Sequence, residues 1–248
     1  MQHNLKSLTG FAIGATNGEI GKVEALYFDD KSWSVRYLVV KTGSWLFGRS
    51  VLISPMALQK PDWKEKDFPT NLTKEQVQNS PDIDTQKPVS RQHEMELSTH
   101  YSWQPYWGSG FYAGGQWGVI PPAPLFGERV MNDVYSTEEV QNETGDLHLR
   151  STSQVTGYHI HATDGEAGHV SDFIIDDTTW QIVNFVIDTH NWIGGKKLVI
   201  PVENIKEISW AATKVILDLS IAGVKGCSTF DESNYDQSEK THSIPVNS

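Results

Sequence analysis

The chain has 248 residues and a formal net charge of −11. This charge argues against binding to nucleic-acid phosphates, because such binding requires clustered lysine and arginine. The single cysteine, Cys227, excludes an internal disulfide and a cysteine-based zinc site. No apolar run reaches the roughly 20 residues of a spanning helix, and residues 1–6 do not resemble a secretory signal. We therefore expect a cytoplasmic protein without a transmembrane segment.

Two halves of the sequence repeat each other. The run Thr9–Val23 reappears as Thr156–Val170 without a gap, at an offset of 147 residues. The same offset relates two carboxylate pairs and several tryptophans, namely Asp29-Asp30 to Asp176-Asp177, Trp33 to Trp180, Trp45 to Trp192 and Trp63 to Trp210. Identity at so many fixed positions indicates a duplicated domain.

The first copy predicts short β-strands. Asn17-Gly18 has the residues of a tight hairpin turn, and further strands alternate with turn signals, as in a small barrel. We expect Thr73 to cap a short helix. The predicted strands are 21–29, 33–42, 51–53 and 68–72, and the helix is 73–79.

An aromatic segment, rich in proline and glycine, separates the copies at residues 82–148. Disordered chains avoid aromatic residues, so we expect it to pack onto the outer faces of the barrels, or onto another protomer or a partner. Stacking on sugars or bases is a further alternative that the acidic charge disfavours. Its aromatic residues are Tyr101, Trp103, Tyr106, Trp107, Phe111, Tyr112 and Trp117.

The second copy predicts the same elements. Its strands are expected at 168–176, 180–189, 198–200 and 215–219, with a helix at 220–226 capped by Ser220. The end of the chain, 228–248, is polar and without periodicity, so we expect a flexible tail. The domains are thus 1–81 for the first barrel, 82–148 for the linker, 149–227 for the second barrel and 228–248 for the tail.

Alternation along the strands predicts the core. The inward residues are Leu26, Phe28, Leu38 and Val40, with Phe173, Ile175, Phe185 and Ile187 in the second copy. The opposite faces are also apolar, at Val35, Tyr37, Val39, Ile182 and Val186. A strand that is apolar on both faces needs a cover. The other barrel, the linker or a second chain could supply it, so a homodimer remains open.

The repeated pattern resembles the PRC-barrel. It consists of Gly-Glu-x-Gly-x-Val, an Asp-Asp turn, a valine-rich strand and a Thr…Trp-Leu/Ile-x-Gly loop before an apolar strand. That domain occurs in the photosynthetic reaction-centre H subunit and in the ribosome-maturation factor RimM. The resemblance implies a mainly β fold of two six-stranded barrels, each closed by a short helix. The linker around Pro88 and Trp103 also resembles that of uncharacterised bacterial tandem-barrel proteins.

The resemblance implies little about activity, because a barrel family is not defined by a site. From this sequence we expect neither the membrane helix of the H subunit nor the N-terminal domain of RimM. The resemblance to the PRC-barrel implies, as one alternative, a soluble accessory role with peripheral association near photosynthetic or other membrane complexes.

A metal or small-ligand site is a second alternative. His159 and His161 face the same way on a strand, and His169 and Asp172 follow on the next arm. Imidazole and carboxylate groups together can hold zinc. However, Tyr158 and Ile160 take the core positions, so we expect His159 and His161 to point outward. Strand parity places His169 on the core side, unless a bulge at Gly168 turns it.

No catalytic constellation is evident. The pairs Asp29-Asp30 and Asp176-Asp177 lie in turns, where their carboxylates are expected to bond local backbone. No nucleophile has an adjacent base, and no phosphate-binding glycine loop precedes a helix. We therefore expect a non-enzymatic interaction or scaffolding protein without a cofactor, whose partner is not identified. The expected contact residues are Trp45, Trp192 and the linker aromatics.

Overall fold

The computed structural model describes residues 1–81, 89, 91–106, 149–189 and 195–235. These belong to two units, one formed by Met1–Gln78 with His148–Ser248 and the other by Asn79–Leu147. Within the described ranges, no helix combines the length and apolarity needed to cross a membrane.

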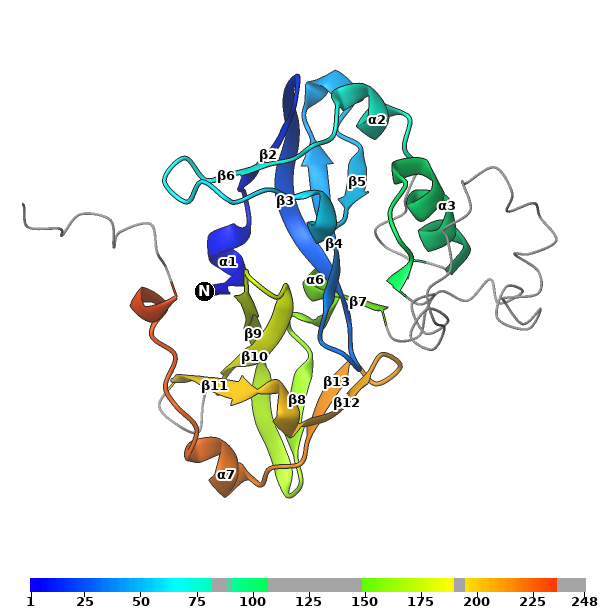
Figure 1. Cartoon of the computed structure of the whole chain (residues 1–248). Coiled ribbons are helices and arrows are strands. Elements are labelled where there is room, and N and C mark those ends of the chain that lie inside the picture. Colours follow the sequence, from blue (N-terminus) through cyan, green and yellow to red (C-terminus); the bar gives the residue numbers. More distant parts are fainter. Residues whose placement is uncertain (82–88, 90, 107–148, 190–194, 236–248) are drawn as a thin grey trace, which may run out of the picture. The chain divides into compact units, whose positions relative to one another are not determined.

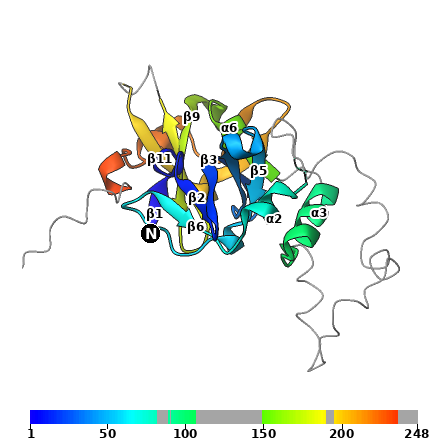
Figure 2. The ribbon, with the colours of Figure 1, turned by 90° about the horizontal axis from the view of Figure 1, so that it is seen from above.

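The first half of the chain forms one sheet, which we call repeat one. Its strands lie in the order β5-β4-β3-β2-β6, all antiparallel except the β2–β6 pair (Figure 1). Seen from above, β3, β2 and β6 run side by side (Figure 2). The strands are β2 (Ala12–Ala15), β3 (Gly18–Asp29), β4 (Val35–Thr42), β5 (Ser50–Ile53) and β6 (Asp67–Pro69).

Repeat two follows the same order, β11-β10-β9-β8-β13, and adds β12 beside β13. Its pair β8–β13 is parallel, like β2–β6. This confirms the predicted tandem, mainly β fold. Strand pairing does not close either sheet, so the expected six-stranded barrels are not confirmed. The strands are β8 (His159–Ala162), β9 (Gly165–Asp176), β10 (Gln181–Asp188), β11 (Lys197–Pro201), β12 (Ile205–Ser209) and β13 (Lys214–Leu217).

Short helices occupy equivalent places in the two repeats. The predicted helices are present as α2 (Lys74–Gln78) and α7 (Ile221–Lys225). Thr73 Oγ1 accepts a hydrogen bond from Gln76 N at 3.2 Å, and Ser220 Oγ accepts one from Gly223 N at 3.2 Å, which confirms both caps. Two further helices, α1 (Leu5–Leu8) and α6 (Thr152–Val155), were not predicted.

Each repeat donates a strand to the other. The first strand of the chain, β1 (Gln2–Asn4), pairs with β9 of repeat two, where His3 lies opposite Ile175. The equivalent strand before repeat two, β7 (Leu149–Ser151), pairs with β3 of repeat one, where Arg150 lies opposite Phe28 (Figure 1). We call β1 and β7 the exchanged arms. Because their registers match at the 147-residue offset, the two repeats are related by an approximate twofold axis.

Side chains that were predicted to face inward, and the backbone of two predicted outer-face residues, meet at the seam between the repeats. Phe28 contacts Phe173 and Phe185, with ring centroids 5.9 and 6.4 Å apart. Two backbone bonds mirror each other across the seam, from Val35 N to Trp180 O at 2.7 Å and from Ile182 N to Trp33 O at 2.8 Å. The predicted core and outer-face residues are all buried. The other repeat thus covers predicted inward residues such as Phe28. On the outer face, Val186 is covered by Phe230 and Tyr235 of the segment after repeat two, which was not among the three expected covers.

The start of the expected flexible tail is packed. Phe230 N donates to Lys197 O at 2.8 Å, and Val199 N donates to Ser228 O at 2.9 Å, so this segment lies along β11. Phe230 and Tyr235 stack and pack against a buried cluster of Ile174, Val186 and Val199. The prediction of a flexible tail rested on the polar composition of residues 228–248 and did not consider that Phe230 and Tyr235 could pack. Residues 236–248 of the tail lie outside the described ranges.

Candidate interaction surface

The loop between β4 and β5, residues 43–49, is the predicted Trp45 loop, and we call it the tip loop. It contains the 3-10 turn η1 (Ser44–Leu46). Trp45 does not form its exposed part, because its Nε1 donates to Ile20 O at 2.7 Å. The ammonium of Lys74 lies 4.3 Å from the centre of the Trp45 ring, as in a cation–π contact. The half-buried Trp45 thus holds the loop to its own repeat.

Phe47 is the exposed aromatic residue of the tip loop. Its side chain is 98 % exposed, and its φ angle of 54° is in the left-handed region. A bulky side chain rarely adopts this conformation, although Trp33, Trp180 and three other non-glycine residues of the described ranges share it, so the exposure of the ring is what distinguishes Phe47. The sequence analysis missed Phe47. The available signal was the repeat offset, which places Gly194, a residue suited to positive φ, at the same position of repeat two.

Lysines lie beside the tip loop. Lys22 on β3 and Lys41 on β4 are exposed and directly opposite each other in the strand register. Like charges at such positions destabilise a sheet. The Cε atom of Lys41 lies 3.9 Å from the place that a Cβ atom at Gly48 would occupy, next to Phe47. The tip loop therefore combines an exposed ring with cations.

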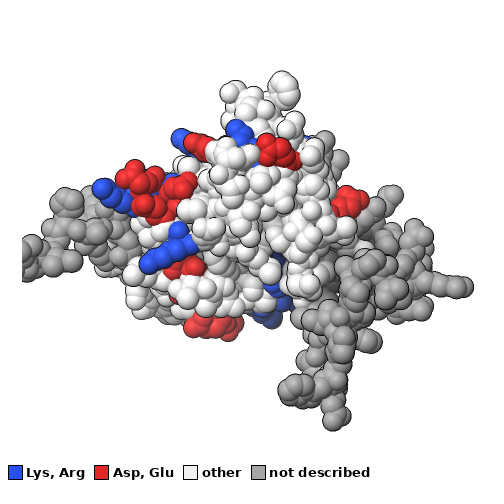
Figure 3. All heavy atoms as spheres, turned by 45° about the horizontal axis from the view of Figure 1, so that its top comes forward, with Lys and Arg blue, Asp and Glu red and all other residues white. Residues whose placement is uncertain are grey.

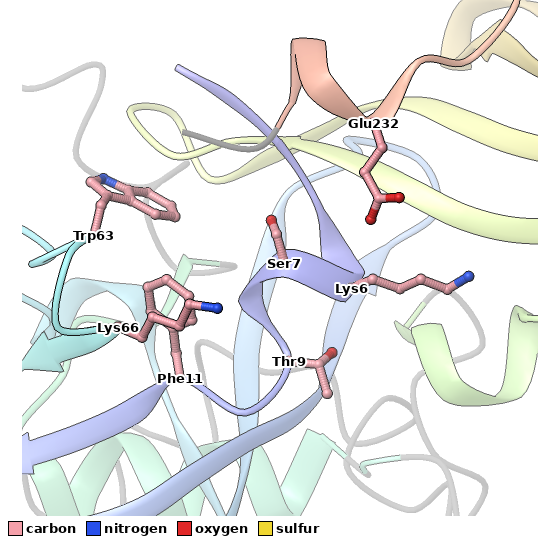
Figure 4. Close-up of a pocket in the computed structure, with 7 residues that line it drawn as sticks. All are labelled: Lys6, Ser7, Thr9, Phe11, Trp63, Lys66 and Glu232. Atoms are coloured by element: carbon pink, nitrogen blue, oxygen red, sulfur yellow. The ribbon is translucent and has the colours of Figure 1, made fainter. Parts of the chain in front are cut away.

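Two cavities lie elsewhere in this unit. One of about 220 Å³ is lined by Lys6, Ser7, Thr9, Phe11, Trp63, Lys66 and Glu232 (Figure 4). Lys6 points away from Trp63 (Figure 4), and the hydroxyls of Ser7 and Thr9 donate to the Asn4 and Leu5 carbonyls. The other, of about 440 Å³, lies at the seam beside Trp63, Phe68 and Trp180. Neither cavity includes a residue of the tip loop.

The sequence model of the PRC-barrel domain matches residues 2–68 and 151–218. These two segments span more than half of the chain and coincide with the two repeats. The chain belongs to the PRC-barrel family. A search of curated proteins found no match.

The histidines of the second PRC-barrel repeat do not gather around one point. His159 is exposed, and its Nδ1 lies 2.8 Å from Glu166 Oε1. Asp172 is buried and bonds Asn4 and the backbone N of Phe173 instead. His161 and His169 are half-buried. Among the residues that the structure describes, no group of three potential ligands could hold a metal.

A bulge explains the position of His169. The register of β8 and β9 shifts between Ile160 and His161, and Gly168 has a φ of 114°. A Cβ at Gly168 would lie 2.1 Å from Asp188 O, so only glycine fits there. His169 is therefore half-buried while Ala167 and Val170 are buried. Strand parity alone was wrong, and the bulge considered as its exception is present.

The carboxylate pairs have divided roles. The first member bonds the turn, as expected. Asp29 Oδ1 accepts from Lys31 N and Ser32 N, both at 2.9 Å. Burial opposes ionisation of Asp29, but these N–H groups and Arg36 outweigh it and lower its pKa. Asp176 Oδ1 likewise accepts from Thr178 N and Thr179 N, at 2.9 and 3.0 Å.

The second member of each pair holds an exchanged arm, which the sequence analysis did not anticipate. Asp30 Oδ2 lies 2.8 Å from Arg150 Nε on β7. Its counterpart Asp177 contacts His3 Nε2 on β1 at 3.1 Å. His3 and Arg150 are equivalent positions of the two PRC-barrel repeats. The repeated Asp-Asp motif thus both closes a turn and fixes the neighbouring repeat.

The described linker residues belong to the other unit. Helix α3 (Arg91–Tyr101) was not predicted. The Tyr106 hydroxyl donates to Glu94, 3.0 Å from Oε1, and Tyr101 stacks on Trp103 with ring centroids 4.3 Å apart. The predicted contact residues Trp107, Phe111, Tyr112, Trp117 and Trp192 lie outside the described ranges.

Proposed function

We propose that this chain is a non-enzymatic interaction or scaffolding protein and that the tip loop is its contact surface. The observation that carries this proposal is Phe47, which is 98 % exposed at a φ of 54°. Both properties cost free energy in an isolated protein, and an aromatic anchor that becomes buried on binding recovers the first cost.

The fold supports a rigid presentation of this loop. Trp45 and Leu46 anchor the loop to repeat one through the Ile20 carbonyl and the core. We also propose that each repeat forms a six-stranded PRC-type barrel. With the arm β7 included, the sheet of repeat one has six strands, whereas that of repeat two has seven with β1. A prearranged contact loses little conformational entropy when it binds.

The proposed partner is another protein or a second copy of this chain, in the cytoplasm. An acidic chain does not favour nucleic acid. In the view of Figure 3, Lys/Arg and Asp/Glu lie in small mixed groups around an uncharged centre, without an extended basic patch on that face.

Photo-crosslinking tests the contact directly. The photoreactive amino acid p-benzoylphenylalanine is placed at position 47 of the full chain and irradiated in the source cells. We expect one discrete adduct, which mass spectrometry identifies as a protein or as a second copy. The matched control carries the same group at Met56, which is also exposed. Adducts that are equal at the two positions would contradict the proposal.

Light scattering on the purified chain provides the second readout. If the partner is a second copy, Phe47→Gly lowers the native mass, because glycine is the residue of repeat two at this place. Trp45→Ala lowers stability in addition, because Trp45 is held within its own repeat. An unchanged native mass for the Phe47→Gly chain, together with equal adducts at positions 47 and 56 of the crosslinking chains, would contradict the proposal.

A further inference from the structure

The residues around the tip loop are more basic and more aromatic in repeat one than the equivalent residues of repeat two. Repeat one has Phe47, Lys22, Lys41 and Lys74, while repeat two has Gly194, His169, Asp188 and Ile221 at the positions 147 residues later. Since repeat two adopts the same strand order without them, the fold does not require the ring or the lysines. Their presence in repeat one calls for another explanation.

The pairing of Lys22 with Lys41 points to an anionic ligand. The two exposed side chains face each other across β3 and β4, so each raises the cost of the other's charge. A negatively charged surface relieves this repulsion. The nearby Glu75 is turned toward the β2–β3 hairpin, where its carboxylate accepts from Asn17 Nδ2 at 2.8 Å.

The shape and the type of cation favour a broad surface over a peptide. Phe47 stands out from its loop with almost its whole side chain exposed. A lone convex ring needs no matching pocket to enter the headgroup region of a bilayer. Lysine acts as a point charge on a flexible stem and does not impose the bidentate geometry of arginine, so it suits mobile anionic headgroups.

We propose that the tip loop docks on the surface of an anionic phospholipid bilayer. The Phe47 ring enters the interfacial region, and Lys22, Lys41 and Lys74 lie at the headgroups. This inference rests on the proposed function in taking the tip loop as the contact surface, and it names a bilayer where that proposal names a protein; vesicle binding and a protein adduct at position 47 distinguish the two. The chain's overall negative charge does not prevent binding, because charges more than about 10 Å from the membrane are screened at 0.1 M salt.

Vesicle sedimentation of the full chain tests this proposal. The probes are phosphatidylcholine vesicles with and without phosphatidylserine. We expect binding only when phosphatidylserine is present, and weaker binding as salt rises. Lys41→Asp, which installs the residue of repeat two, should weaken binding about fivefold for each of the two charge units changed. Phe47→Gly should weaken it roughly tenfold or more, since it removes the inserted ring.

Matched controls separate this surface from a general effect. Lys206→Asp makes the same charge change at an exposed lysine of repeat two, and Met56→Ala removes another exposed apolar side chain. Both should bind vesicles like the unchanged chain. Equal binding by all variants, or no binding to phosphatidylserine vesicles, would overturn the proposal. A protein adduct at position 47 without vesicle binding would contradict the bilayer proposal and support the proposed function. If neither the adduct nor vesicle binding is observed, both proposals for the tip loop are wrong.

Discussion

At the scale of single residues, Asp172 accepts a hydrogen bond from the backbone of β9. In repeat one, the equivalent backbone N–H of β3 donates to Thr152 instead. In repeat one, Thr152 Oγ1 on the segment after β7 accepts from Leu26 N at 3.0 Å. In repeat two, the equivalent Phe173 N donates to Asp172 Oδ1 at 2.9 Å, and Asn4 Nδ2 of the arm β1 donates to Asp172 Oδ2 at 3.2 Å. The carboxyl group thus joins the arm to the sheet in a buried place.

Burial raises the pKa of Asp172 above its ordinary value of 3.8, although Phe173 N and Asn4 oppose the shift. A raised folded pKa means that this group favours the folded state at low pH. Its contribution is fully present below about 3.8 and is lost as pH rises through the raised pKa. We therefore compare the free energies of unfolding of the wild type and of Asp172→Asn. We expect the wild-type value minus the variant value to fall as pH rises from about 3.8 through the raised pKa of Asp172, and then to stay constant.

Urea unfolding of both proteins at a series of pH values measures this difference. Asp29 and Asp176, whose pKa values are lowered, act in the opposite direction but are common to both proteins. They therefore cancel in the difference. A difference that grows with pH would contradict the prediction, because it would mean that the fold prefers the carboxylate.

Residue-level prediction succeeded where strand alternation applies and failed where it does not. Leu38 and Phe185 were correctly predicted to be buried because they lie in uninterrupted stretches of strand pairing, whereas Phe28 is buried although it lies at a register shift between β3 and β4. Asp172 was grouped with the histidines, since the register shift in β9 near Asp172 was not visible in the sequence. The tip loop has no periodicity, and Trp45 was chosen as an aromatic residue beside glycines that recurs as Trp192, whereas Phe47 has no aromatic counterpart in repeat two.

At the scale of elements, Gly21 sets the path of the long strand β3. A Cβ atom added at Gly21 would lie only 2.1 Å from Lys41 O, a distance that real Cβ atoms do not show. Gly168 meets Asp188 O at the same distance in repeat two. The repeated Gly-x-Val motif therefore reflects a close approach of two backbones.

Gly21→Ala should lower the free energy of unfolding by at least about 2 kcal/mol, because the backbone must move apart. Gly43→Ala is the matched control, since a Cβ there meets only the Trp45 ring, at an ordinary 3.6 Å. We expect the control to change stability by no more than about 0.5 kcal/mol. Denaturant titration of the two variants gives both values, and similar losses would refute the close-approach argument.

The hairpins and helix caps were predictable because their signals are local. Asn17-Gly18 and Thr73 specify a turn and a cap within a few residues. The exchanged arms were not predictable, because a strand of three residues has no period and β1 finds its partner more than 160 residues away. Helix α3 was not predicted, although Ser90, a residue type favoured at N-caps, directly precedes Arg91 in the sequence.

At the scale of the whole chain, the exchanged arms make each repeat depend on the other. The Arg150–Asp30 pair is a measure of this coupling, since its side chains are only 12 % and 10 % exposed. Arg150→Met leaves the Asp30 carboxylate without this cation in a largely buried place. We expect a loss of about 2–4 kcal/mol, with faster amide exchange in β3 and also in β9.

Hydrogen exchange followed by mass spectrometry measures both strands at once. Arg36→Met is the matched control, because Arg36 and its partner Asp29 belong to one repeat and are more exposed, at 20 % and 18 %. Its effect should remain in repeat one. If Arg150→Met changes exchange in repeat one alone, the two repeats open independently and the arms do not couple them.

The exchange of arms has a consequence for how this chain could diverge. A single repeat that paired with an identical copy through the same arms would carry two identical loops, so any change at one would appear at both. Joining the copies in one chain removes that constraint while the seam keeps its symmetry. One end could then acquire Phe47 and its lysines, and the other could retain Gly194, without altering the residues that hold the halves together.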